Sequence, residues 1–431
     1  MNVIFLLLFF LVFIIIGVPI CYSLGMSSIL FLMFTNPGFI EMIPQRIWAG
    51  TNIYVMIALP LFILAGELMN SGGITKRIID FSLFTVKPIK GGLGEVNVFA
   101  SMIFGGISGS SVADTSAIGS VMIPQMVKKG YSRGFSAGIT VASSTMGMII
   151  PPSVPMLTYS MISGASVGAL FMAGVIPGIL IGGSQIVISK IISKKNNYKL
   201  DLSEELKHKN IFNIAREGIL ALIMPVLIVI TISFGIATAS ESAGVAVLYS
   251  FIIGYFVYRE LKIKDLPRIL KRTVLSSSSV MIVIGFSMIF SWILAMVQFP
   301  NTVSNFFMNL DISKFWILLM LDIFILLIGM FIDVTPALLL VTPLLLPIMN
   351  SIGVDTLQFG TIMIVGLAMG LVTPPLGMCL NACTKIRDCD LSIVDIFRNA
   401  IPFLACNFFI LLLVTFVPQV SLWLPKISGL L

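Results

Sequence analysis

The stretch GGISGSSVADTSAIGSVMIP (Gly105–Pro124) places a carboxylate and several small hydroxyl residues inside sequence that is otherwise apolar enough for lipid. A second stretch, LIGMFIDVTPALLLVTP (Leu327–Pro343), has the same character. In each, an aspartate lies ten residues before the closing proline, and a proline pair follows 37 residues after Asp114 and 41 after Asp333. A duplicated apolar segment interrupted by Gly and Pro indicates the binding site of a secondary transporter.

The composition assigns the chain to the membrane class. Of its 431 residues, 58% are hydrophobic and 10% charged, and the mean hydropathy is +1.07. Many windows exceed the ~18 apolar residues that cross a bilayer, and alternating barrel strands are absent. We therefore predict an all-α polytopic protein with two structural repeats, about 11 transmembrane helices and two re-entrant helical hairpins. The net charge of +7 suits loops that face anionic lipid and gives no reason to expect nucleic-acid binding.

Catalytic motifs are absent from the sequence. It contains no GxxxxGK[ST], HExxH or GxSxG pattern, so we predict neither ATP hydrolysis nor another enzyme activity. The five cysteines and the single histidine, His208, match no zinc spacing or disulfide framework.

The apolar runs predict the organisation of the chain. Spans are expected near residues 3–22, 51–69, 96–125, 136–162, 168–192, 217–237, 243–258, 274–298, 315–332, 336–350, 357–384 and 398–418. The predicted parts are N-terminal scaffold helices (1–50), repeat 1 with a hairpin and a broken helix (51–189), a basic cytoplasmic loop with arm helices (190–272), and repeat 2 with its own hairpin and broken helix (273–431). The loops at 190–216 and 259–272 hold seven and six basic residues, which predicts a cytoplasmic location for both.

The first interruption carries the chemistry of a cation site. Gly109 has no side chain, and Ser108, Ser110 and Ser111 supply hydroxyl oxygens. Irregular backbone at membrane depth persists only where it is buried in protein or lines a wet cavity. Freed carbonyls and hydroxyls suit a hard cation, and half-helix N-termini suit an anion. The alternative is close helix packing through small residues.

The two aspartates are expensive in lipid. Asp114 and Asp333 each cost ~2.5–3.5 kcal/mol at a helix centre, and neither has a Lys or Arg in its own segment. A bound cation would neutralise them. The alternative is that each caps the N-terminus of a half-helix, and the two interpretations are compatible.

The proline pairs break their helices and free upstream carbonyls. Ser144 and Thr145 lie beside the first set of carbonyls and Thr373 beside the second. Ser153 and Asn381 follow the pairs, where they are expected to face the substrate, or else to make an ordinary helix-to-helix hydrogen bond.

At these residues the chain resembles the large membrane subunit of tripartite ATP-independent periplasmic (TRAP) transporters. The likeness spans nearly the whole chain and rests on FGGISGSSVADTSAIGSVMIP, MGMIIPPSVPMLTYS, SVGALFMAGVIPGIL, MFIDVTPALLLVTPLLLPI and GLAMGLVTPPLGMCLNAC. One departure is ATASESAGV (Ala237–Val245), where the family more often has TPTEAA. Glu241 is kept and the proline is lost.

The resemblance implies an elevator-type transporter of the bacterial inner membrane, with two or more transported Na+ ions bound where hairpins and broken helices meet. It also implies two partners, a small membrane subunit of about four helices and a periplasmic substrate-binding protein. The chain starts at its first helix, so the small subunit is expected to be a separate polypeptide. Family substrates are organic acids such as C4-dicarboxylates, sialic acid and other sugar acids.

We therefore predict sodium-coupled import of a small organic anion, with sialic acid the first expectation and a C4-dicarboxylate or another sugar acid the next. The predicted substrate-binding residues are Ser108, Ser110, Ser111, Ser153, Asp333 and Asn381. The predicted sodium ligands are Gly109, Ser110, Asp114, Ser144, Thr145, Pro151, Asp333, Thr335, Thr373 and Gly377. The alternative function is a stand-alone sodium- or proton-coupled carboxylate transporter or antiporter without partners.

Overall fold

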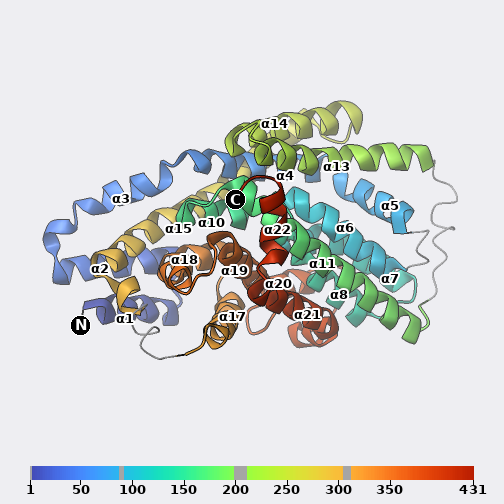
Figure 1. Ribbon diagram of the computed structural model, residues 1–431. Coiled ribbons are helices and arrows are strands. Elements are labelled where there is room, and N and C mark those ends of the chain that lie inside the picture. Colours follow the sequence, from blue (N-terminus) through green and yellow to red (C-terminus); the bar gives the residue numbers. More distant parts are fainter. Residues whose placement is uncertain (1, 87–91, 199–210, 304–311) are drawn as a thin grey trace.

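The computed structural model describes residues 2–86, 92–198, 211–303 and 312–431. Every regular element within these ranges is helical, which confirms the predicted all-α class (Figure 1). Eight helical stretches in the same ranges are long and apolar enough to cross a membrane: Tyr54–Ser71, Val167–Lys195, Ile211–Ser233, Ala239–Val257, Ile263–Met296, Lys314–Phe331, Val334–Ser351 and Ile393–Phe416. Shorter apolar helices accompany them, so the chain is a polytopic membrane protein.

The N-terminal segment differs from its prediction. The single span expected at 3–22 is two helices, α1 (Asn2–Ile15) and α2 (Ile20–Thr35). Gly17 takes a φ of 90° between them, and Pro19 lacks the amide that a continuous helix needs. α1 and α2 pack on the second half of α15 (Leu266–Met296) through a separate apolar cluster that includes Leu6, Phe10, Leu24, Phe31, Ile289 and Phe290.

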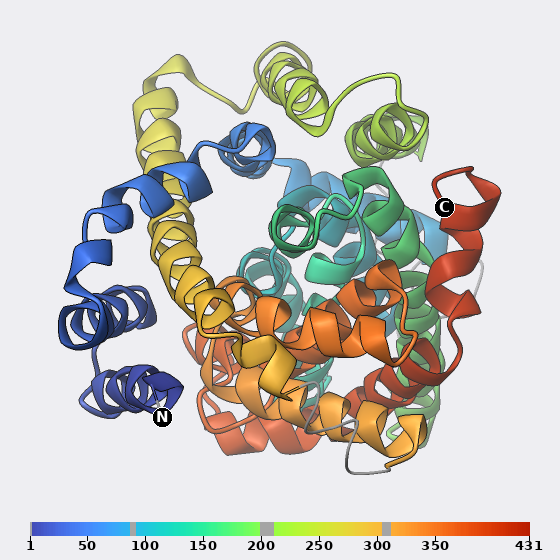
Figure 2. The same ribbon diagram turned by 60° about the vertical axis from the view of Figure 1, so that its left-hand side comes forward.

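A scaffold of helices surrounds the two repeats. It contains α1, α2, α3 (Met42–Thr51), α4 (Ala58–Ser71), α13 (Ile211–Ser233), α14 (Ala239–Ile252) and α15. Figure 2 shows these helices as an outer arc around the remaining helices. α4 packs along α14 and α15, and a π-helical turn, η4 (Ile253–Val257), ends α14.

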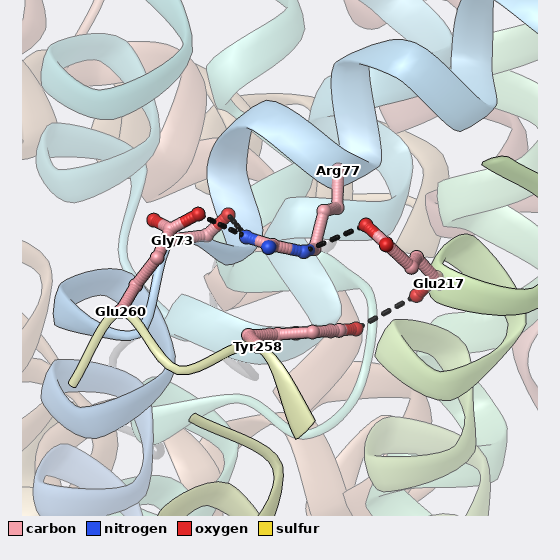
Figure 3. Close-up of polar contacts among 5 residues, drawn as sticks. All are labelled: Gly73, Arg77, Glu217, Tyr258 and Glu260. Carbon is pink, nitrogen blue, oxygen red and sulfur yellow. Dashed lines mark hydrogen bonds and ion pairs between the residues drawn. The ribbon is translucent and has the colours of Figure 1, made fainter. Parts of the chain in front are cut away.

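One mostly buried cation joins three parts of the chain at the edge of this scaffold (Figure 3). Arg77 of α5 (Ile74–Val86) donates through Nε to Glu217 of α13 at 2.9 Å and through Nη1 to Glu260 at 2.8 Å. Its guanidinium carbon lies 3.9 Å from the ring centre of Tyr258, whose hydroxyl donates to the carbonyl of Glu217. Only 13% of the Arg77 side chain is exposed, so this cluster fixes α5 against α13 and the segment after η4.

Repeat 1 contains a helical hairpin and a broken helix. The hairpin consists of α6 (Leu93–Ser108) and α7 (Ser111–Lys128). The broken helix consists of α8 (Arg133–Ser144), α9 (Met146–Ile149) and α10 (Val154–Ser163), and α11 (Val167–Lys195) follows.

Repeat 2 has the same order of elements. Its hairpin is α17 (Lys314–Phe331) and α18 (Val334–Ser351), and its broken helix is α19 (Thr356–Gly370) and α20 (Met378–Thr384). α21 (Ile393–Phe416) and the short α22 (Gln419–Ile427) complete the chain. Residues of both repeats share one continuous apolar core.

The structure corrects the alignment of the two copies. The helix that leaves the hairpin tip is capped by Ser110 in repeat 1 and by Asp333 in repeat 2, and these residues are 223 positions apart. The same spacing separates Pro124 from Pro347, Gly147 from Gly370, and Pro151 from Pro374. Asp114 therefore lies one helical turn beyond the residue equivalent to Asp333, which explains the unequal spacing of 37 and 41 residues.

Glycine pairs bring each hairpin against its broken helix. A Cβ atom on Gly105 of α6 would lie 2.9 Å from the Cα atom of Gly147 in α9. In repeat 2, a Cβ atom on Gly329 of α17 would lie 3.0 Å from the Cα atom of Gly370 in α19. The helix backbones touch at these points, which leaves no room for side chains. The peptide bond within each proline pair, Pro151–Pro152 and Pro374–Pro375, is cis.

The predicted division of the chain does not coincide with helix ends. The boundaries after residues 50, 189 and 272 fall inside α3, α11 and α15. Part of the predicted basic loop, with Lys199, Lys207, His208 and Lys209, lies outside the described residues.

Candidate functional site

A cavity of about 300 Å³ lies where the two hairpin tips meet the scaffold. Repeat 1 contributes the tip of its hairpin and the start of α10, and repeat 2 contributes the start of α18 and Met378. Helices α4 and α15 form the remaining wall. Among the predicted site residues, the cavity brings together Ser108, Gly109, Ser110, Asp333 and Thr335.

Three helix N-termini open onto this cavity. α7, α10 and α18 begin there, and residues from the start of each line its wall. The first amides of a helix have no partner within the helix, and the helix dipole places partial positive charge at this end. The cavity therefore offers an environment that favours an anionic group.

Asp333 has the geometry of a helix cap. Its Oδ1 accepts a hydrogen bond from the amide of Val334 at 2.8 Å, and the residue is partly buried at the cavity wall. The structure thus contains the capping hydrogen bond that was the alternative interpretation of this residue. Asp333 lines the cavity, and so does Thr335, two residues further along α18.

Asp114 is in a different environment, behind the tip of hairpin 1. Its side chain is fully buried in the first turn of α7, and no described residue forms a hydrogen bond with either carboxylate oxygen. Ser101 of α6 faces it, and the Ser101 hydroxyl also lies 3.0 Å from the hydroxyl of Ser143, where either group could donate. The hydroxyls of Ser111 and Thr115 are also buried without a partner among the described residues.

These four unpaired oxygens fit a cation. Unpaired buried polar atoms are costly, and an unpaired buried carboxylate is costlier still. A hard cation is bound by such a set of carboxylate and hydroxyl oxygens without release of protons from them. Ser111 was predicted to bind the substrate, but it does not line the cavity and instead belongs to this buried group.

The remaining predicted ligands of the first broken helix have partners within the protein. The Ser144 hydroxyl donates to the carbonyl of Val141. The Thr145 hydroxyl donates to the carbonyl of Ala142 and accepts from Asn407 at 3.1 Å. The carbonyl of Pro151 points at Gly106, since a Cβ atom there would lie 2.9 Å from its oxygen.

In the second broken helix, Thr373 donates its hydroxyl back to the carbonyl of Met369. Gly377 has a φ of 46°, and a Cβ atom there would lie 3.2 Å from the carbonyl oxygen of Thr373. Asn381 donates to the carbonyl of Leu376 at 2.5 Å, so its amide stabilises the loop and lies outside the cavity.

Ser153 also lies outside the main cavity. Its hydroxyl donates to the carbonyl of Met148 and accepts from the amide of Met156, which makes it the cap of α10. It lines a small adjoining space of about 10 Å³ beside Ser108 and Gly109. Its predicted contact with substrate would require a change at this cap.

Three polar cavity residues were not predicted. Glu67 and Asn70 of α4 and Ser276 of α15 line the scaffold wall, and Glu67 lies 3.9 Å from Arg272. The signal for Glu67 was an acidic residue within an apolar span, the same signal that singled out the two aspartates. Its place opposite the hairpin tips follows only from the packing of α4 against α15.

Comparison with known proteins decides the family. The sequence model described as "Tripartite ATP-independent periplasmic transporter, DctM component" matches residues 7–420. The chain belongs to the DctM family. This confirms the predicted resemblance and identifies the chain as a transporter subunit of the multi-pass membrane class, not an enzyme.

Two curated relatives illustrate the range of the DctM family. The sialic acid TRAP transporter large permease protein SiaM of Vibrio cholerae is 36% identical over 411 residues, or 95% of each chain. The C4-dicarboxylate TRAP transporter large permease protein DctM of Pseudomonas aeruginosa is 34% identical over 408 residues, also 95% of each.

A solved structure shows the same fold at low identity. The YdaH transporter of Alcanivorax borkumensis matches with a TM-score of 0.61 over 90% of this chain and 89% of that chain, at 13% identity. This likeness concerns the architecture of the DctM-family chain alone.

Proposed function

We propose that this chain is the large membrane subunit of a sodium-coupled TRAP transporter that imports a small organic anion across a bacterial inner membrane. The observation that carries the proposal is the cavity between the two hairpin tips, with the unpaired oxygens around Asp114 directly behind it. The curated relatives act on sialic acid and C4-dicarboxylates by their names, and we expect a substrate of this class. Sialic acid is our first expectation.

The cavity suits a small anion in size and polarity. About 300 Å³ is at the lower end of the range for small-molecule sites. The three helix N-termini attract a carboxylate, and Ser108 and Ser110 offer hydroxyls for hydrogen bonds.

Sodium resolves an electrostatic conflict in this site. Asp333 and Glu67 line the cavity, and Glu67 already has a cationic neighbour in Arg272 at 3.9 Å, so an anion that enters meets an uncompensated carboxylate at Asp333. Like charges in close contact are destabilising, and a bound cation removes the conflict at the Asp333 wall. A second cation at Asp114 neutralises the buried carboxylate and orders the first turn of α7. Anion binding then depends on prior cation binding, which is the basis of coupling.

The apolar clusters separate only part of the scaffold from the repeats. The repeats share one apolar core with the scaffold helices α4, α13 and α14, whereas α1, α2 and the second half of α15 form another. We propose that the loaded repeats slide as one body past the scaffold, as in an elevator. Family membership implies a small membrane subunit, which would extend the scaffold, and a periplasmic binding protein, which would deliver the substrate.

The test is uptake into proteoliposomes that contain this chain and the small subunit, with the binding protein outside. We expect accumulation of a radiolabelled organic acid only with an inward sodium gradient. Uptake that is indifferent to that gradient would overturn the coupling. Equal uptake by this chain alone would replace the tripartite assembly with a stand-alone transporter.

A further inference from the structure

Asp322 is a buried carboxyl group that the proposed transport site does not use. It lies in α17, the first arm of hairpin 2, and its side chain is 0% exposed. It is 11 residues before the tip residue Asp333, or about 16 Å along the helix axis. It does not line the cavity.

The polar contacts around Asp322 are few. The Thr415 hydroxyl of α21 lies 3.0 Å from Asp322 Oδ1 and 2.9 Å from the carbonyl oxygen of Leu411. No described residue forms a hydrogen bond with Asp322 Oδ2. The amide of Gln358 in α19 donates to the carbonyls of Val414 and Thr415 and not to the carboxyl group.

The number of hydrogens at this site distinguishes the two forms of Asp322. A hydroxyl has one hydrogen, and an ionised carboxylate only accepts. Ionised Asp322 would therefore bury a full charge with at most one hydrogen bond. If Asp322 Oδ1 instead carries a proton, it donates to the Thr415 hydroxyl, and this hydroxyl donates to the carbonyl of Leu411. Both hydroxyl hydrogens of this short series of hydrogen bonds then have an acceptor.

The elements packed on α17 supply no neutralising charge. α18 and α19 contain no titratable residue between their caps and their last turns. The cap of α19, Asp355, would add a like charge. Lys314 of α17 is eight residues from Asp322, or about 12 Å, and donates to the carbonyl of Gly353.

α21 supplies no cation either. Its charged residues, Asp395 and Arg398, are in its first two turns, at least 17 residues before Thr415, and its Cys406 lies between. The ring of Phe416, the residue after Thr415, stacks on Phe315 with centroids 4.8 Å apart.

We propose that Asp322 and Thr415 form a proton-binding site that joins hairpin 2 to α21, separate from the substrate and sodium sites. Asp322 is a neutral carboxylic acid at neutral pH. Loss of its proton leaves an uncompensated charge between α17, α19 and α21, which separates the hairpin arm from its neighbours. The packing of hairpin 2, and with it transport, is then weakened as pH rises.

Infrared difference spectroscopy of the full-length chain in lipid nanodiscs tests the protonation state directly. The wild-type spectrum minus that of Asp322→Asn should contain the carbonyl stretch of a protonated carboxyl group at neutral pH, and the band should shift in D2O. Thr415→Val should retain the band at higher frequency, because the carboxyl loses its hydrogen-bond partner. A spectrum without this band would overturn the proposal.

Thermal stability gives a second readout. The melting temperature of the wild type should fall as pH rises from about 4, where an unfolded aspartate ionises, to the pH at which Asp322 itself loses its proton, and Asp322→Asn should remove that part of the fall. Asp390→Asn, a change at an exposed loop residue, should follow the wild type. If Asp322 instead holds a cation, the wild type would gain stability with sodium that Asp322→Asn lacks, and this result would also overturn the proposal.

Discussion

Asp114 and Asp333 differ in burial and in partners, although both lie near the start of a hairpin's second helix. Asp333 caps its helix at the cavity wall, whereas Asp114 is fully buried without a hydrogen-bond partner among the described residues. The buried residue therefore has the larger electrostatic need for a cation. Substitutions at the two positions should have different effects.

Asp114→Asn should weaken the stabilisation of the chain by sodium. Removal of an unpaired buried charge should leave the sodium-free protein as stable as the wild type or more stable. The sodium concentration at half-saturation should rise at least about tenfold, which corresponds to a loss of about 1.4 kcal/mol of binding free energy. Melting temperature against sodium concentration measures both effects. Ser116→Ala, an exposed change half a turn away on α7, is the matched control. Unchanged sodium dependence in Asp114→Asn would exclude Asp114 as a ligand.

Asp333→Asn separates charge from capping, because Asn caps helices about as well as Asp. We expect normal membrane insertion and loss of sodium-dependent uptake. Asp333→Ala should in addition lose about 0.5–2 kcal/mol of stability with the cap. Uptake assays paired with melting curves measure the two contributions. If Asp333→Asn takes up substrate like the wild type, the role of Asp333 is limited to capping α18.

At the scale of elements, the hairpins depend on close contact between helix backbones. Gly105→Ala places a methyl group 2.9 Å from the backbone of Gly147, and backbone atoms cannot move aside cheaply. We expect the free energy of unfolding to decrease by about 1–3 kcal/mol, which a lower melting temperature would show.

Gly183→Ala is the control for this change. Gly183 lies inside α11 with open space around it. The same methyl group should therefore increase the free energy of unfolding by about 0.5–1 kcal/mol, because alanine favours the helix more than glycine does. We therefore expect the two substitutions to change the melting temperature in opposite directions. Equal effects would show that the contact between α6 and α9 is not tight.

The sequence predicted the elements well where a local signal marks a break. Glycines and prolines located both hairpin tips and both broken helices, because these residues act on their own backbone. The copies were aligned one turn out of register, since the interior of α18 contains two prolines, Pro343 and Pro347, and only the second matches Pro124.

Contacts between distant segments were not predictable in the same way. The Thr145 hydroxyl meets Asn407, and Asn407 accepts from Gln185 at 2.8 Å, so three helices from two repeats share one buried polar network. Each residue alone looks like an isolated polar group in an apolar span. Their meeting depends on the packing of α8, α11 and α21, which no local pattern encodes.

At the scale of the whole molecule, the Arg77 cluster joins α5 to α13 and to the segment after η4. Arg77→Lys keeps the charge but loses the planar fork and the stacking on Tyr258. We expect a loss of about 1–3 kcal/mol in thermal stability. Arg133→Lys changes an exposed pair with Asp390 and should cost less than about 1 kcal/mol. Similar losses in both variants would show that burial of Arg77 adds nothing.

The two repeats have the same arrangement of helices but different charges at equivalent positions. At the tip position that corresponds to Asp333, repeat 1 has the neutral Ser110, and both residues look into the same cavity. While no cation is bound at Asp333, the two walls therefore have unequal electrostatic potentials. In that state, a guest molecule with an acid group at one end and hydroxyls at the other is expected to place its acid group toward repeat 1 and its hydroxyls toward Asp333.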